Sequence, residues 1–380
     1  MLSIGLVLCA GRGAETQRVR LPEDHAFVHP GVLHNQAELN AIRKQVRAEA
    51  EPRISGWEKL RDHRVARLNW TPDPRAHVKR GAYNNPDVGA TEFMMDGQAA
   101  QAHAIQWYVT QNREHARKAV EVLNAWSHTL RTISEHDARL LVGMAGVNYV
   151  NAAELMKHTY DGWSNPDQRA FRRMLREVFY PVIKDFYPTA NGNWDASMIQ
   201  TMMAMGVFLE DRRMFNRAVD YYMYGRGNGA VNHYIHERGI VQESGRDQAH
   251  TQMGLGYLAI SAEIGWKQGL DLYGAHDNRL ARGYEYTAKY NLGEEVPYEP
   301  FTSIEQRYHY PDISSDGRGN FSVIYERVLN HYANRADVEV PYTRRVVKNI
   351  RPQGFSSAHV SWGTLLFAKL PSLPPGHNPQ

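Results

Sequence analysis

Residues 195–210 read DASMIQTMMAMGVFLE and are apolar nearly all the way round a helix. A helix of this kind is expected to be enclosed by other helices. The stretch after Asn112 shows the complementary pattern, because its apolar residues fall on one stripe while its charged residues face away. That stripe consists of Ala116, Ala119, Val120, Leu123, Trp126 and Leu130. Together the two patterns predict an inner layer of helices covered by an outer one.

Helical spacing of apolar residues recurs along most of the chain after residue 30. The expected helices lie at about 35–50, 96–111, 112–130, 138–160, 166–187, 195–210, 212–224, 247–268, 277–291 and 320–334. Asn165-Pro166 and Asp211 are expected helix starts, and Gly162 and Gly225 expected helix ends.

Alternating strand patterns are scarce, and the best candidates are Val338–Tyr342 and His359–Phe367. The sequence therefore predicts an all-α fold with little β structure. Consecutive expected helices are joined by short turns. This pattern predicts stacked helical hairpins, arranged either as an open solenoid or as a ring.

The composition is that of an ordinary globular protein, with 42% hydrophobic and 22% charged residues among 380. It argues against extensive disorder and against membrane insertion. No stretch reads as a linker, so we expect a single domain over residues 30–372. The net charge of +3 is too balanced for a protein that neutralises many phosphates, so no nucleic-acid partner is expected. The 21 Tyr, 8 Trp and 18 His suit a hydrated, sugar-like ligand.

The first ten residues, MLSIGLVLCA, resemble the hydrophobic part of a secretory signal that lacks its basic start. Residues 1–16 are therefore interpreted as a signal-peptide remnant or a frayed N-terminus, and the protein is expected to be secreted or periplasmic. Cys9 is the single cysteine, which excludes an internal disulfide and a cysteine-based zinc site.

One polar cluster, NGNWD at residues 191–195, directly precedes the enclosed helix. Asp195 fits the role of a helix cap. The two amides, Asn191 and Asn193, exceed what a cap needs. Because a helix N-terminus favours negative charge, these amides can receive a carboxylate.

A second cluster, QESGRDQAHTQ at residues 242–252, leads into an apolar helix. If this stretch is helical, Arg246 shares a face with His250, and Glu243 and Asp247 share a face with the same histidine. An acid can then orient His250. The alternative is a purely structural salt-bridge network.

The third cluster, EQRYHY at residues 305–310, places Arg307, Tyr308 and Tyr310 on a loop. Its two phenols are either exposed surface residues without a catalytic role or proton donors. Arg318 follows on the same loop.

Tyr83, Gln98 and His103 can line the same cleft, although the last two are equally explained as helix-surface residues. His233 and His236 have the wrong spacing for one helical face, and the glycines of 225–229 lack the preceding strand of a phosphate loop. We therefore expect no metal site and no cofactor.

Four stretches carry a resemblance to a known family: NGNWDASMIQTMMAMGVF, QESGRDQAHTQMGLGYLAISAEIGW, EQRYHY and HVSWGTLLF. They resemble the alginate-lyase-like superfamily of polysaccharide lyases, most closely the alginate and glucuronan lyases of family 38. The similarity extends from about residue 35 to residue 370. It implies an incomplete (α/α) toroid of helical hairpins that binds an acidic polysaccharide and cleaves it by β-elimination.

Such a reaction on a 4-linked uronan needs three functions: neutralisation of the sugar carboxylate, removal of the C5 proton and protonation of O4. By resemblance, Asn193 and Asn191 match the neutraliser, with support from Arg246 or Arg307. His250 matches the base, and either Tyr308 or Tyr310 the acid, unless one tyrosine serves as both. Older families carry Asn-His where this chain has Gly192-Asn193. The remaining candidates for substrate binding are Trp194, Glu243, Gln248, Tyr83, His103 and Arg318.

Two other functions are compatible with these residues. One is a glycoside hydrolase that uses Glu243 and Asp247 as an acid and base pair, although two carboxylates four residues apart are poorly arranged to flank a glycosidic bond. The other is a helical glycan-binding protein whose aromatic residues only stack on sugar.

Overall fold

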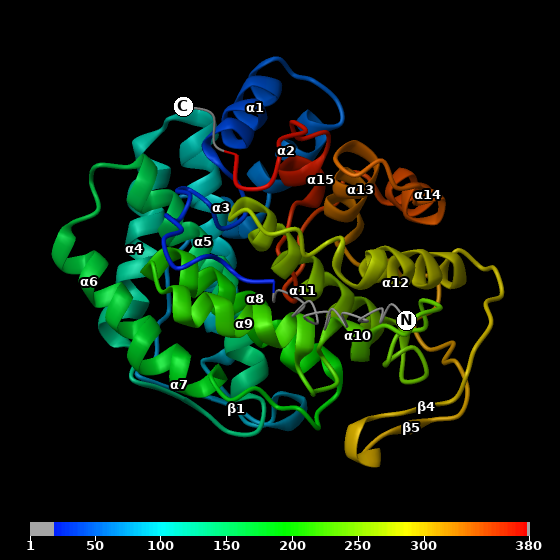
Figure 1. Ribbon diagram of the computed structural model, residues 1–380. Helices are drawn as coiled ribbons and strands as arrows, with labels where there is room; N and C mark the ends of the chain where they lie inside the picture. The colour runs from blue at the N-terminus through cyan, green and yellow to red at the C-terminus, as the bar shows by residue number, and fades with distance from the viewer. Residues whose placement is uncertain (1–18, 378–380) are drawn as a thin grey trace, which may run out of the picture.

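The computed structural model describes residues 19–377. These residues are predominantly helical, and the predicted all-α, incomplete (α/α) toroid is confirmed (Figure 1). The signal segment expected at residues 1–16 lies outside the described residues. Among the described residues we find no helical segment with the length and hydrophobicity of a membrane span.

Four long inner helices form the core of the ring, and each packs beside the next along the chain. They are α3 (Ala90–Thr110), α5 (Ala138–Thr159), α8 (Gly192–Leu209) and α11 (Gln248–Lys267). The helix that the sequence predicts to be enclosed is α8, and it is buried along almost its whole length. The outer layer consists of α4 (Arg113–Thr129), α6 (Asn165–Met174), α7 (Tyr180–Ile183), α9 (Arg212–Tyr224) and α12 (Ala275–Asn291). A π-helical turn at Leu175–Phe179 joins α6 to α7.

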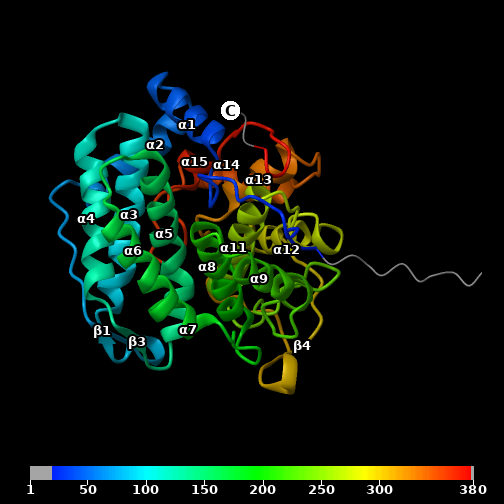
Figure 2. The ribbon, with the colours of Figure 1, turned by 60° about the vertical axis from the view of Figure 1, so that its left-hand side comes forward.

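The inner helices run in the same direction. Gly143 of α5 lies against Ser197 of α8, and Gly146, one turn further on, lies against Thr201. A Cβ atom on Gly143 would come within 2.2 Å of the Ser197 hydroxyl, so the close approach of the two helices requires glycine there. The amino ends of the inner helices consequently gather at one end of the ring, where the short strands also lie (Figure 2).

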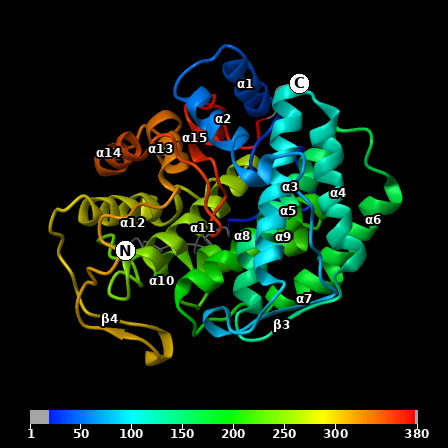
Figure 3. The same ribbon diagram turned by 180° about the vertical axis from the view of Figure 1, so that it is seen from behind.

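Shorter helices fill the remaining sector of the ring between α11 and α3 (Figure 3). They are α1 (Gln36–Arg47), α2 (Arg53–Arg61), α13 (Tyr325–Asn334), α14 (Pro341–Ile350) and α15 (Gly363–Phe367). The one-turn helix α10 (Val231–Tyr234) packs instead against α9 and α12. Short 3-10 turns occur at Arg64–Ala66, Ala82–Asn84 and Ile304–Gln306.

The strands are short. In one sheet β1 (His77–Arg80) pairs antiparallel with β2 (Asp87–Val88) and parallel with β3 (Thr132–Ser134). In the other, β4 (Phe301–Thr302) and β5 (His309–Tyr310) form a hairpin in which Phe301 lies opposite Tyr310.

Both predicted strands are wrong. Pro341 begins α14, where the missing N–H of proline is no loss in the first helical turn. The second stretch contains α15, and a short apolar run of this kind cannot be distinguished from a buried helix by its pattern.

The predicted helices are mostly confirmed, but α3 begins at Ala90 rather than near residue 96 and α13 begins at Tyr325 rather than near residue 320. Asp211 caps α9, accepting a hydrogen bond from the Met214 N–H at 3.0 Å, and Gly225 ends it. Ser164, one residue before the predicted start, caps α6. Asp195 is not a cap: α8 begins three residues earlier, so that Asp195 lies inside its first turn as a buried carboxylate.

Four buried charges tie the ring together where the short helices meet the inner ones. Lys267 of α11 contacts Glu38 of α1 at 2.7 Å, and Arg335 at the end of α13 contacts the same carboxylate at 2.8 Å. Both cations also pair with Glu263 of α11, and all four side chains are 1% exposed. The cluster holds two acids and two bases, so it buries no net charge.

Replacing Glu263 by glutamine is expected to lower the free energy of unfolding by about 3–5 kcal/mol, because Lys267 and Arg335 then share a single buried carboxylate. Burial raises the pKa of Glu263, but Arg335 and Lys267 outweigh this effect and hold the pKa well below its usual value. The ionised carboxylate therefore stabilises the fold above about pH 4.5, and this contribution is lost as the pH falls further.

Urea unfolding of the wild type and of Glu263→Gln, at pH 7 and at pH 3.5, measures both effects. The difference in the free energy of unfolding between the wild type and Glu263→Gln should be smaller at pH 3.5 than at pH 7. Asp161→Asn, which removes an exposed partner of Arg113, is the control and should leave the midpoint nearly unchanged. A difference that is equally large at both pH values would contradict the account.

Candidate active site

The amino ends of α8 and α11 meet at the strand-bearing end of the ring, and the second polar cluster lies between them (Figure 2). Backbone N–H groups at the start of a helix carry partial positive charge. Because the inner helices are parallel, several of these ends face the same region. This end of the ring therefore favours an anionic ligand.

Glu243 is the centre of the cluster and is completely buried. Its Oε1 accepts hydrogen bonds from the Asn193 backbone N–H at 3.0 Å and from the Tyr234 hydroxyl at 3.3 Å. Its Oε2 accepts from the Asn193 amide at 3.1 Å and from Arg246 Nη1 at 2.8 Å. Burial raises the pKa of Glu243, while the charge of Arg246 and the hydrogen bond from the Asn193 backbone oppose that rise.

The turn that carries Glu243 differs from the sequence-based expectation. Residues 243–246 do not belong to a helix, because α11 begins at Gln248 with Asp247 as its cap. Glu243 and His250 are consequently not neighbours on one helical face. Glu243 instead reaches back to the start of α8, and Arg246 lies beside it with its side chain 27% exposed.

A chain of hydrogen bonds fixes how the Asn191 amide is oriented. The Gly192 N–H donates to Gln242 Oε1 at 2.8 Å, so that Gln242 Nε2 donates to Asn191 Oδ1 at 2.9 Å. The Tyr310 hydroxyl donates to the same Oδ1 at 3.1 Å. Within residues 19–377 the Asn191 amide nitrogen makes no hydrogen bond, so it is available to a ligand carboxylate.

Asn193, the other predicted amide, is fully buried. Its nitrogen is committed to Glu243, and its Oδ1 has no hydrogen-bond partner among the described residues. Asn193 therefore holds Glu243 in place from the first turn of α8.

Asp247 orients His250, as the sequence suggests, but it does so from the cap position. Its Oδ1 accepts the His250 backbone N–H at 2.7 Å, and its Oδ2 lies 2.6 Å from His250 Nδ1. Burial would raise the pKa of Asp247, yet the hydrogen bonds from His250 and the charge of Arg246 lower it overall. An ionised Asp247 keeps the proton on Nδ1, so the lone pair of a neutral His250 is on Nε2, and the side chain is 34% exposed.

The two tyrosines of the third cluster flank the site from the β4–β5 hairpin. Their rings are parallel, with centroids 6.4 Å apart. Burial, together with the nearby charge of Glu243, raises the pKa of Tyr310 to about 12. The Tyr310 phenol therefore keeps its proton at neutral pH.

Close packing positions Tyr310. A Cβ atom on Gly245 would lie 2.4 Å from the Tyr310 Cβ, so only glycine lets the hairpin approach the turn this closely. The Tyr298 hydroxyl donates to the Tyr310 carbonyl at 2.8 Å.

An aromatic and basic surface continues beside the tyrosines. Arg307 is exposed, donates to the Tyr187 hydroxyl at 3.0 Å and lies over the rings of Tyr187 and Tyr308. Trp194 packs edge-on against Tyr187 and against His136.

The sequence analysis did not identify Tyr187, His136, Tyr234 and Arg139 as site residues. Arg139 lies over the Tyr187 ring, and Tyr234 bonds to Glu243. Each of these residues stands alone in the sequence, outside the three polar clusters. Only the fold brings them to the site.

Four predicted substrate-binding residues are not part of this cluster. Gln248 is buried, with its amide bonded to the Ser314 carbonyl at 2.9 Å and to Asn291 at 2.9 Å. Arg318 donates to the Tyr290 carbonyl at 2.9 Å and lies over that ring. Both side chains are occupied by contacts that hold the loop of residues 311–320 against α11 and α12.

His103 and Tyr83 are the other two. His103 and Gln98 of α3 are completely buried rather than on the helix surface, and His103 contacts His115 at 2.9 Å. Burial lowers the pKa of His103 to about 3. Tyr83 is 96% exposed in the turn between β1 and β2, and no contact joins it to the cluster among the described residues.

A ring of helical hairpins with amide, guanidinium, imidazole and phenol groups gathered at one end defines the class that the resemblance implied, the helical-toroid polysaccharide lyases. The sequence profile of the family described as "Alginate lyase" matches residues 63–297. Since this match spans more than half of the chain, the protein belongs to the alginate lyase family. The match does not separate the branches, so membership of family 38 stays a prediction.

Solved structures of alginate lyases share the fold. Alginate lyase A1-III from Sphingomonas species A1 is 13% identical, with a TM-score of 0.64 over 88% of this chain and 97% of that one. An alginate lyase from Bacteroides ovatus is 12% identical, with a TM-score of 0.64 over 89% and 99%. A histidine-to-alanine variant of A1-III complexed with a tetrasaccharide is 14% identical, with a TM-score of 0.63 over 90% and 96%. A search of curated protein sequences found no match.

The central role of Glu243 predicts that even an isosteric change is costly. Both carboxylate oxygens only accept hydrogen bonds, so the amide of Glu243→Gln must point its NH₂ group either at the Asn193 backbone N–H or at Arg246. We expect the free energy of unfolding to fall by about 3 kcal/mol or more.

Urea unfolding tests this expectation, with Glu237→Gln as the control because the Glu237 side chain is 87% exposed. Equal midpoints for Glu243→Gln and the wild type would show that Glu243 does not hold the cluster together.

Proposed function

We propose that the protein is a polysaccharide lyase that cleaves a 4-linked uronan by β-elimination, with alginate as the leading substrate and glucuronan as the second. One observation carries the proposal: a free amide nitrogen, an arginine, an aspartate-bound histidine and a protonated tyrosine surround one buried carboxylate. The family match supports it. So do two solved complexes of the Sphingomonas enzyme with a tetrasaccharide, one of a histidine variant and one of a tyrosine variant.

The first function, neutralising the uronate carboxylate, falls to Asn191 and Arg246. Removing the C5 proton places more charge next to a carboxylate that is already negative, so fixed donors aimed at that group lower the barrier. The amide nitrogen of Asn191 has no hydrogen-bond partner among residues 19–377, and the Arg246 side chain is 27% exposed. Asn193, expected in this role from the sequence, acts instead by holding Glu243 and through it Arg246.

The second and third functions fall to His250 and Tyr310. His250 Nε2 takes the C5 proton as the C4–O4 bond breaks and the C4–C5 double bond forms. The Tyr310 hydroxyl gives its proton to O4 of the leaving chain and regains one from solvent. Tyr310 fits this role better than Tyr308, because its hydroxyl is already bonded to Asn191.

The surface beside these groups suits neighbouring sugars. Trp194 and Tyr308 offer aromatic rings for stacking, and Arg307 offers a cation for the carboxylate of an adjacent residue. The secreted or periplasmic location expected from residues 1–16 stays a prediction.

A hydrolase is less compatible with the geometry. Glu243 is buried beneath four hydrogen-bond donors, and Asp247 is occupied by His250. Neither carboxylate is placed to flank a glycosidic bond, which needs opposed groups about 5–9.5 Å apart.

The reaction type can be tested with pure polymannuronate, polyguluronate and glucuronan. We expect absorbance near 235 nm, roughly the region of a conjugated unsaturated uronate, to rise with at least one alginate block. New reducing ends without that absorbance would indicate a hydrolase. Saturable binding with unchanged chain length would indicate a glycan-binding protein, and either result would refute the proposal.

The identity of the acid can be tested with a matched pair of variants. Tyr310→Phe removes the hydroxyl that bonds to Asn191 and is expected to lower kcat by about 10²-fold or more. Tyr308→Phe keeps the ring and should change kcat only a few-fold. The opposite ranking would assign protonation of O4 to Tyr308.

A further inference from the structure

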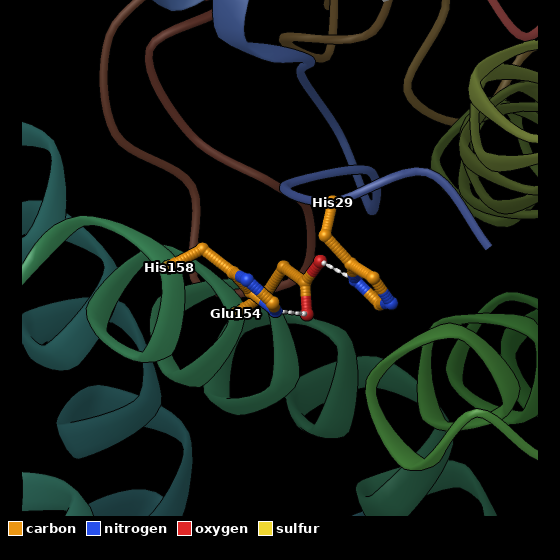
Figure 4. A group of neighbouring side chains, drawn as sticks. All are labelled: His29, Glu154 and His158. Atoms are coloured by element: carbon orange, nitrogen blue, oxygen red, sulfur yellow. Dashed lines mark hydrogen bonds and ion pairs between the residues drawn. The ribbon is translucent and has the colours of Figure 1, made fainter.

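A separate group of three polar residues, His29, Glu154 and His158, lies outside the proposed active site. His29 belongs to the segment that precedes α1, and Glu154 and His158 lie one turn apart on α5 (Figure 4). His29 Nδ1 is 2.7 Å from Glu154 Oε1, and His158 Nε2 is 3.7 Å from Glu154 Oε2. The two imidazole rings stack with centroids 4.4 Å apart. One donor atom from each residue lies within 4.8 Å of the other two.

The protein groups around this cluster leave several donor atoms unused. The Glu154 side chain is 1% exposed, and its Oε1 accepts hydrogen bonds from the Gly31 N–H and from His29. Glu154 Oε2 and the Nε2 atoms of both histidines are buried and make no hydrogen bond within residues 19–377.

No lysine or arginine of the described chain pairs with Glu154, whose ionic partners there are the two histidines. A buried carboxylate without a fixed cation is costly, as are buried nitrogen atoms without partners. A metal cation that accepts electron pairs from the two imidazoles and the carboxylate would satisfy these atoms.

We propose that His29, Glu154 and His158 bind a divalent transition-metal ion, Zn²⁺ by preference, which fastens the segment of residues 19–34 to α5. Two nitrogen ligands and one oxygen ligand suit Zn²⁺, whereas Ca²⁺ and Mg²⁺ prefer oxygen alone. Tetrahedral Zn²⁺ holds its ligand atoms about 3.4 Å apart and binds in the plane of each imidazole, so closing the site requires one of the two stacked rings to rotate about its side-chain bonds.

The fourth coordination position is left to a water molecule. Glu210, at the end of α8, lies 4.0 Å from His29 Nε2, whereas the His29 nitrogen that faces Glu154 is Nδ1, so Glu210 is not placed to ligate the same ion.

The site is structural rather than part of the proposed elimination reaction. Gly143, at the end of α5 that lies near the start of α8, precedes Glu154 by eleven residues, which is roughly 16 Å along the helix. The segment that carries His29 also bonds to α9 through Leu21 and Asn216, and it bonds to Gln268 after α11 through Val28. A metal ion at His29 would therefore fix the segment of residues 19–34 to α5, in addition to its hydrogen bonds with α9 and with the end of α11.

Calorimetric titration of chelator-treated, tag-free protein with ZnCl₂ tests the proposal. We expect one ion per chain and a rise of Tm that MgCl₂ does not reproduce. Glu154→Gln and His158→Ala should each weaken Zn²⁺ binding by about 10²-fold. His128→Ala, which removes another carboxylate-paired histidine, is the matched control and should bind Zn²⁺ like the wild type.

Co²⁺ provides a test that does not depend on the variants folding. Wild-type protein loaded with one equivalent of Co²⁺ should show visible d–d absorption that Zn²⁺ abolishes. Absence of saturable Zn²⁺ binding by the wild type, or unchanged affinity in both ligand variants, would overturn the proposal. None of these measurements uses lyase activity, so their outcome is independent of the proposed function.

Discussion

Glu243 accepts four hydrogen bonds from groups on three separate segments: the first turn of α8, the short helix α10 and the turn that precedes α11. A carboxylate is costly to bury. Here the backbone N–H and the side-chain amide of Asn193, the Tyr234 hydroxyl and Arg246 offset that cost. Because these donors come from different elements, the contact fixes the relative positions of the helix ends that carry Asn191 and His250. The proposed chemistry depends on this one buried group.

The architecture of the ring explains why such a site forms at this end. Glycine contacts let α5 and α8 pack closely in the same direction, so helix amino ends collect on one side. Partial positive charge at those ends favours a polyanion, while the β4–β5 hairpin brings a neutral phenol to it. The buried cluster of Glu38, Glu263, Lys267 and Arg335 joins the short helices α1 and α13 to the inner helix α11.

The sequence predicts the inner helix correctly because an apolar surface all the way round leaves no solvent-facing side. It also identifies the stretches that meet at the site, since polar residues gathered before apolar helices are conspicuous. It misassigns the geometry of Glu243, because a helical wheel cannot reveal that Asp247 ends the turn and caps α11. His103 and Arg318 look accessible in sequence, yet the fold buries one and occupies the other. His29 and Glu154 are 125 residues apart, so only the structure pairs them.

The central claim is that Asn191 and Arg246 cancel the charge of the sugar carboxylate. Comparing a free uronan with its methyl ester tests this claim directly, because the ester carries no charge to cancel. The account predicts that Arg246→Ala and Asn191→Ala lower kcat on the free uronan by about 10²-fold or more, yet lower it only a few-fold on the ester. Equal losses on both substrates would contradict charge neutralisation as the role of these residues.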